Sequence, residues 1–103
     1  MSKQKEKGKM FYDVAVKRAN GGWQSNKNRK KDIWANIKNG YVYISYDSGR
    51  SYWIFYNYPK DMKFPKITAN DKTKIIRINR NAIKFNKEKD YEFAKECLLP
   101  WSR

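Results

Sequence analysis

The sequence predicts a small α+β domain: an antiparallel sheet of four to five strands with a C-terminal amphipathic helix packed on one face. Apolar residues alternate from Ile33 to Tyr58, two turn signals interrupt that stretch, and the spacing becomes helical after Lys87. A chain of 103 residues has the length of one domain. We expect residues 10–103 to form it and residues 1–9, with four lysines, to be a disordered basic arm.

The first predicted strand covers residues 10–18. Its side chains alternate, with Met10, Tyr12, Val14 and Val16 on one face. Such a pattern is typical of a strand with one buried face.

A long exposed loop is predicted for residues 19–31, which are rich in Gly and Asn and then strongly basic. Like charges held close together repel one another unless an anion lies among them, which favours phosphate contact. A plain charged surface loop is the alternative. Trp23 is expected to fold back onto the core, because an exposed indole is costly, and an exposed indole ready to stack on a ligand is the alternative. The candidate phosphate-binding residues here are Lys27, Arg29, Lys30 and Lys31.

Asn39-Gly40 is the strongest hairpin signal in the chain, because a type I′ turn needs positive φ at both central residues. A two-residue loop pairs Lys38 with Tyr41, and directly opposed residues share a face. The predicted pairs beyond it are Ile37 with Val42, Asn36 with Tyr43, Ala35 with Ile44, and Trp34 with Ser45. One face then collects Ile33, Ala35, Ile37, Val42 and Ile44, and the other Trp34, Asn36, Lys38, Tyr41, Tyr43 and Ser45.

Residues 26–38 also allow a helical interpretation. Ile33, Trp34 and Ile37 lie at helical spacing, and Asn39-Gly40 would then end a helix. The alternating segment that follows, YVYISY, favours the hairpin.

A second turn at residues 47–50 extends the meander to Tyr58, and loops of two or four residues give the same parity. The predicted pairs are Ser45 with Tyr52, Ile44 with Trp53, and Val42 with Phe55. Trp53 and Phe55 would join the apolar face. The other face would then be extended by Tyr52, Ile54, Tyr56 and Tyr58.

This aromatic row is unusual for a sheet. A solvated face normally carries Thr, Lys, Glu and Ser. A face of Tyr and Trp is therefore expected to be covered by the chain's own helix, by a partner protein or by stacked bases.

Beyond the meander, Pro59 and Pro65 indicate a connector that leaves the sheet. A turn at residues 70–72 precedes a predicted strand over residues 73–80, with Ile76 and Ile78 on one face. Its apolar pattern extends past an irregularity at Asn81 to Ile83 and Phe85.

The C-terminal helix is predicted over residues 87–99. Tyr91, Ala94 and Leu98 form its apolar stripe, with Phe93 and Cys97 beside it. Asn86 is the expected N-cap, and Pro100 is expected to stop the helix.

The amino-acid composition of the chain limits the functions that it can have. The chain has 24 Lys and Arg against 10 Asp and Glu, a formal net charge of +14, which favours a polyanionic partner such as nucleic acid. It has no His and only one cysteine, Cys97, so we expect no disulfide, no metal site, no cofactor and no conventional nucleophilic pair. No apolar run is long enough to span a membrane and no signal peptide is evident, which predicts a cytoplasmic protein without a membrane partner.

The segment NGYVYISY, residues 39–46, is similar to the main signature of RNA-recognition motifs. Asn39 stands where that family has a basic residue, and Val42 where it has a small one. The resemblance covers these eight residues and implies that Tyr41 and Tyr43 stack on bases. The predicted order of strands followed by a helix also resembles coactivator-type and Whirly-type single-strand binders.

These observations predict a basic nucleic-acid-binding protein with little sequence preference, in which cations neutralise phosphates and aromatic rings stack on unpaired bases. DNA or RNA, single or double strand, and the oligomeric state stay open. One alternative is a phage or mobile-element inhibitor or adaptor that docks on an acidic protein or ribonucleoprotein. Another is a small toxin-type ribonuclease without His, although no acid–base pair stands out. The candidate site residues are Lys27, Arg29, Lys30, Lys31, Lys38, Tyr41, Tyr43, Arg50, Tyr52 and Tyr56.

Overall fold

The computed structural model describes residues 8–26, 32–46, 50–57 and 64–103. Within them, nine strands form two antiparallel sheets and a helix follows, which confirms the predicted α+β class. The first sheet has the order β1 (Lys9–Phe11), β4 (Trp34–Lys38), β5 (Tyr41–Tyr46) and β6 (Arg50–Tyr56). The second has the order β3 (Gln24–Ser25), β2 (Val14–Lys17), β9 (Asn81–Phe85), β8 (Ile75–Ile78) and β7 (Ile67–Asn70). Helix α2 (Glu88–Leu98) continues into a 3₁₀ turn, η1 (Leu99–Trp101).

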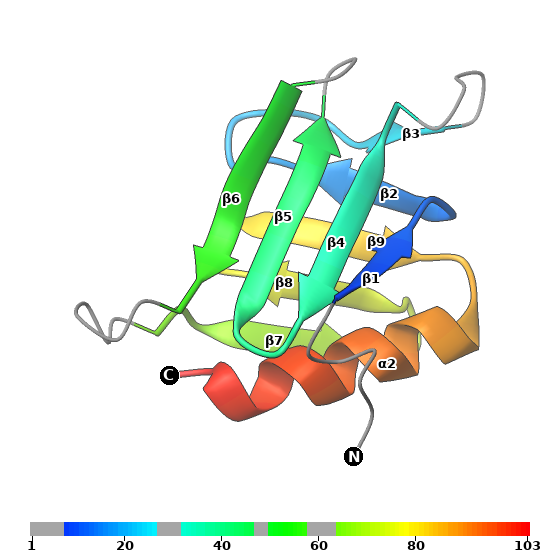
Figure 1. Cartoon of the computed structure of the whole chain (residues 1–103). Helices are drawn as coiled ribbons and strands as arrows, with labels where there is room; N and C mark the ends of the chain where they lie inside the picture. Colours follow the sequence, from blue (N-terminus) through cyan, green and yellow to red (C-terminus); the bar gives the residue numbers. More distant parts are fainter. Residues whose placement is uncertain (1–7, 27–31, 47–49, 58–63) are drawn as a thin grey trace.

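The two sheets lie one in front of the other with their strands crossing, and α2 runs along one end of this sandwich (Figure 1). Side chains from both sheets and from α2 share one buried cluster, so the core lies between the sheets and is closed by the helix. Among the described residues, no helix is long and apolar enough to cross a membrane. The core of the first sheet consists of Phe11, Ile33, Ala35, Ile37, Val42, Ile44 and Phe55. The second sheet and the helix add Val14, Val16, Ile67, Ile76, Ile78, Ile83, Phe85, Tyr91, Ala94, Cys97 and Leu98.

The strand predicted over residues 10–18 is divided in two at residues 12–13. β1 pairs with β4 in the first sheet, whereas β2 pairs with β9 in the second. Phe11 and Val14 both face the core, so the alternation changes parity at the bend and Tyr12 is exposed instead of buried. The chain changes sheets here, which a regular period of two cannot encode.

The hairpin between β4 and β5 has the predicted register at all five pairs, from Lys38 with Tyr41 to Trp34 with Ser45. The helical alternative for the described part of residues 26–38 is therefore wrong. The turn differs from the predicted type I′: Gly40 has φ +72°, whereas Asn39 does not have positive φ.

Between β5 and β6 the predicted register holds only on the side of the bulge near the first hairpin. Val42 pairs with Phe55 as expected, but the next pair is Tyr43 with Trp53, so Ile54 is an extra residue in a β-bulge. The expected pairing of Ile44 with Trp53 is wrong, because Ile44 pairs with Tyr52. The bulge thus exchanges the faces of Tyr52 and Trp53, and it turns Ile54 toward the core.

In the second sheet, Ile76 and Ile78 are buried as predicted. The irregularity expected at Asn81 is a chain reversal: Asn79 has φ 55°, and β9 runs back along β8. The strand β7, which follows Pro65, was not predicted. β7 alternates, with Ile67 and Ala69 against Thr68 and Asn70, but four residues are too few for the pattern to stand out.

Helix α2 buries the predicted stripe of Tyr91, Ala94 and Leu98. The expected N-cap is wrong: Lys87 holds that position without a side-chain hydrogen bond, and Asn86 Nδ2 instead donates to Asp13 Oδ1 at 2.6 Å. The Tyr91 hydroxyl donates to the Asp71 carboxylate, which ties the helix to the β7–β8 turn.

Candidate nucleic-acid interface

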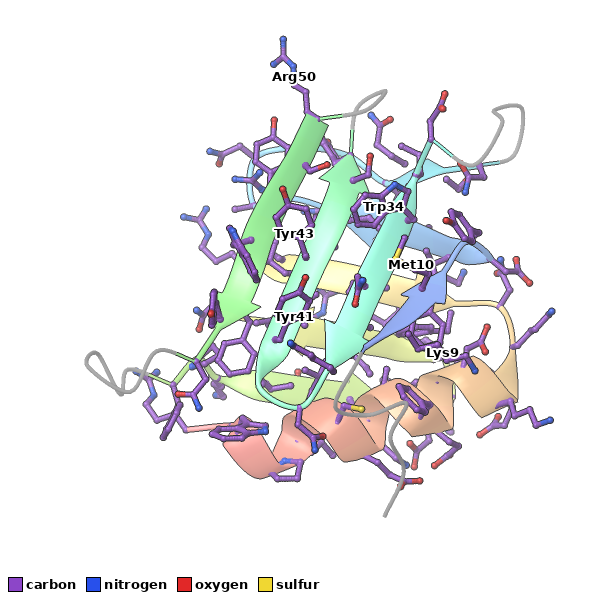
Figure 2. The ribbon with its side chains drawn as sticks, viewed as in Figure 1. Lys9, Met10, Trp34, Tyr41, Tyr43 and Arg50 are labelled. Carbon is purple, nitrogen blue, oxygen red and sulfur yellow. The ribbon has the colours of Figure 1, made fainter. Side chains whose placement is uncertain are left out.

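Five aromatic side chains lie on the outward face of strands β4, β5 and β6, away from the second sheet. Figure 2 shows three of them projecting from the front of the first sheet. The residues that alternate with them, such as Val42 and Ile44, are buried in the core, so the pleat places the rings outside. We call this surface the aromatic face; its members are Trp34, Tyr41, Tyr43, Trp53 and Tyr56.

The aromatic face is open to solvent within the described structure. Trp53 is 48% exposed and Tyr56 is 42% exposed, and neither belongs to the core that α2 closes. The residues that α2 buries all belong to that core, on the other side of the sheet. Of the three coverings expected for an aromatic sheet face, the chain's own helix is therefore excluded.

Trp53 lies at the centre of the aromatic face. Its ring centroid is 4.7 Å from that of Tyr43 and 4.8 Å from that of Tyr41, both in edge-to-face geometry. It also stacks on Tyr56 at 4.4 Å, and Trp34 stacks on Tyr43 at 5.9 Å. Such contacts hold the rings in defined orientations, so little side-chain entropy is left to lose when a flat ligand binds.

The rings also desolvate one another. Partial burial raises the pKa of the Tyr41 phenol above its ordinary value, and the neighbouring Tyr43 and Tyr56 raise it further. Tyr41 is therefore a neutral phenol at physiological pH, and it adds no negative charge that would repel an anion.

Two predicted cations flank the aromatic face. Lys38 comes from β4 and places Nζ 4.7 Å from the centroid of Tyr41. Arg50 begins β6 and is exposed at the opposite end of the sheet (Figure 2). Met10 in β1 shares the face through its pairing with Asn36 and is 38% exposed, which widens the apolar surface.

Tyr52 is the predicted site residue that the structure removes from this surface. The bulge turns it to the core side of β6, where it packs against the buried cluster. The Arg18 guanidinium lies 3.8 Å from its ring centroid, and the two side chains line a small pocket with Tyr46 at the edge of the sandwich. Tyr52 is therefore not part of the aromatic face.

The bulge also places Trp53 on the aromatic face, which the sequence pattern did not predict. Trp53 was expected in the core, yet it is the most exposed ring of the aromatic face. The segment YWIFY has large apolar side chains at every position, so its pattern does not reveal the extra residue. Trp23 was likewise expected to fold onto the core but is 42% exposed.

The other four candidate site residues belong to the predicted basic loop. Lys27, Arg29, Lys30 and Lys31 lie outside the described residues, as does Tyr58. The part of the chain that is described has no group of three or more His, Cys, Asp or Glu side chains that could hold a metal ion. The aromatic face presents five rings, and Asn36 and Lys38 share its side of β4, a set suited to stacking and to charge contact.

The comparison with RNA-recognition motifs extends only to the aromatic strand. Tyr41 and Tyr43 lie outward on β5, as that resemblance implies. That family has a helix between its first two strands, whereas here β1 is joined to β2 directly through residues 12–13. No known protein family, curated protein or solved structure matches the chain significantly. The aromatic face is therefore the main structural indication of function.

Proposed function

We propose that this protein binds single-stranded nucleic acid on its aromatic face with little sequence preference. The observation that carries the proposal is the set of five mutually packed rings on an open sheet face of a strongly basic chain. Every base has a flat π-surface, so a platform of rings accepts any base that is not paired. Bases within a duplex are already stacked on each other and cannot reach the rings.

Stacking of bases on the rings would supply part of the binding free energy. Base–aromatic stacking contributes roughly 1–3 kcal/mol per base. Trp53 and Tyr56 expose the largest ring area, and they are held in place by Tyr41 and Tyr43. Two or three stacked bases would therefore supply several kcal/mol before any phosphate contact is counted.

Electrostatics supply the rest of the proposed affinity. With a net charge of +14, the chain attracts a polyanion, and each phosphate that it neutralises releases condensed counterions. Lys38 and Arg50 stand at the two ends of the aromatic face, where a strand crossing the rings would place phosphates. Backbone contacts of this kind carry no sequence information.

The proposed stacking is tested by replacing Trp53, the central ring of the aromatic face. Trp53→Ala should weaken binding to a labelled oligothymidylate by roughly 5- to 150-fold, the equivalent of about 1–3 kcal/mol, in a fluorescence anisotropy titration. Trp23→Ala is the matched control, because Trp23 is an indole of similar exposure outside the aromatic face, and it should bind nearly as tightly as the original chain.

Duplex DNA of the same length serves as the competitor. It should bind the original chain more weakly than the single strand, and Trp53→Ala should change that weaker affinity little. Equal losses for single strand and duplex would contradict base stacking. If neither variant affects binding, the aromatic face would instead be a protein-docking surface, as the inhibitor or adaptor alternative requires.

A further inference from the structure

Four cationic side chains converge on one surface hollow in the second sheet, far along the chain from the predicted basic loop. The hollow has a volume of about 690 Å³ and is open to solvent. It borders β7, β8 and the last residue of the chain. The lining residues are Lys66, Thr68, Arg77, Asn79, Arg80 and Arg103, and we call it the four-cation hollow.

The backbone around the four-cation hollow is firmly tied together. Asn79 Oδ1 accepts from the Lys66 amide at 3.0 Å, and the Asn79 amide donates back to the Lys66 carbonyl at 2.9 Å. The C-terminal segment is fixed to β7 in a similar way: the Ile67 amide donates to Ser102 Oγ at 2.9 Å, and the Arg103 amide donates to the Pro65 carbonyl at 2.8 Å. These bonds fix the backbone positions of Lys66 and Arg103 before any ligand arrives.

No side-chain ion pair found within the described ranges involves the four cationic side chains of the hollow. No Asp or Glu lines it, and the ion pairs found in the described ranges involve Lys9, Lys74 and Lys95 instead. Electrostatic screening in water acts over about 8 Å at physiological ionic strength, so cations around one such hollow repel one another. An anion with several oxygens would relieve that repulsion, and Arg77, Arg80 and Arg103 offer planar forks that match phosphate.

A short path of contacts joins the aromatic face to the four-cation hollow. Gly40 and Asn57 lie next to the ring pair Tyr41 with Tyr56, at the end of the hairpin. A Cβ atom on Gly40 would lie 3.1 Å from the Trp101 ring and 3.2 Å from Asn57, so Trp101 packs directly against this end of the hairpin. Arg103, which lines the hollow, is two residues beyond Trp101, so the C-terminal segment runs from this end of the hairpin to the hollow.

We infer that the four-cation hollow is a second binding site, which takes the phosphodiester backbone of the strand whose bases stack on the aromatic face. The inference rests on the proposed function for the path of the strand. It adds a site on the second sheet, with phosphate as its ligand.

The experiment removes two of the guanidinium groups that line the four-cation hollow. Arg77→Ala with Arg80→Ala is compared with Lys72→Ala with Lys89→Ala, which removes the same charge from exposed positions outside the hollow. Each protein is titrated over a salt series with an oligothymidylate and with an abasic deoxyribose-phosphate strand of equal length. The arginine variant should lower the slope of log K against log salt by about 1.4 on both strands, at about 0.7 for each lost phosphate contact in a single strand. The lysine variant should lower it far less.

Equal slopes for the two double variants would overturn the site. The same follows if poly-glutamate binds the original chain as tightly as the abasic strand does, since an acidic protein would then be the better ligand. Failure of the proposed function looks different: the oligothymidylate would bind no more tightly than the abasic strand, and Trp53→Ala would have no effect, while the arginine variant would still lower the slope. That result would leave a phosphate site without a stacking platform.

Discussion

The two outward faces of the sandwich cover the same core but carry opposite chemistry. The outward face of the first sheet is a packed set of rings, whereas exposed positions on the second sheet include Thr68, Arg77 and Lys84. Threonines and cations are what solvent-facing strands ordinarily carry. Apart from the cations that line the four-cation hollow, the second sheet has the polar surface that solubility requires, whereas the first sheet carries a packed set of rings.

The rings of the aromatic face are not needed to complete the core of the first sheet. The inner side of β5 already buries Val42 and Ile44 completely, so the core of the first sheet is complete without Tyr41 and Tyr43. Aromatic side chains outside a finished core add little to folding and expose apolar area to water. A partner that covers them, such as the single strand proposed above, would give a physical reason for these exposed rings.

The largest expected effect separates the two sides of β5. Ile44→Ala should destabilise the protein by roughly 2–5 kcal/mol, because it empties a fully buried position. Tyr43→Ala removes two ring contacts on an open face and should cost less than about 2 kcal/mol. Urea denaturation of both variants measures the difference.

Binding should rank the same two variants in the reverse order. Tyr43→Ala should lose single-strand affinity, whereas folded Ile44→Ala should largely keep it. If Tyr43→Ala unfolds the protein as severely as Ile44→Ala, the rings are structural and the contrast between the two outward faces disappears.

The first hairpin could be predicted residue by residue because its signal is local. Asn39-Gly40 closes the turn, and apolar alternation on both sides fixes which residues face the core. That register placed Trp34, Tyr41 and Tyr43 together on the face away from the core, but it left open whether the helix covers that face. The α+β class and the helical stripe were readable for the same reason, since Tyr91 and Leu98 follow a helical period.

What could not be predicted depends on contacts between distant segments. The bulge at Ile54 leaves no trace in a stretch where every side chain is large and apolar, so Trp53 was assigned to the wrong face. The bend near Tyr12 exists because the chain passes from one sheet to the other. The four-cation hollow joins Lys66, Arg80 and Arg103, whose proximity appears only once β7 lies beside the C-terminal segment.

A smaller effect tests the bulge itself. Deleting Ile54 should leave Trp53 opposite Tyr43 and Phe55 opposite Val42, because both pairs already fit a regular ladder without the extra residue. The expected cost is the loss of one half-buried side chain, about 1 kcal/mol. Thermal unfolding and oligothymidylate binding check this, and affinity should change little.

Deleting Trp53 instead is the informative counterpart. The chain length is the same as in the first deletion, but the central ring is lost, so single-strand affinity should fall as in Trp53→Ala. Similar binding by the two deletion variants would show that the bulge does not place Trp53 on the aromatic face.

The smallest expected effect is a pKa, and it reports how tightly the rings of the aromatic face pack. Burial holds the pKa of Tyr41 above its ordinary value of 10.0. Because the folded-state pKa exceeds the unfolded one, the stabilisation linked to this phenol is fully present below about pH 10 and is lost as the pH rises through the raised pKa. Trp53→Ala uncovers the Tyr41 ring and should move its pKa back toward 10, whereas Trp23→Ala should leave it unchanged; NMR titration of the Tyr41 ring measures both. An unchanged Tyr41 pKa in Trp53→Ala would mean that the two rings do not shield one another in solution, and the aromatic face would then be a set of independent side chains rather than one platform.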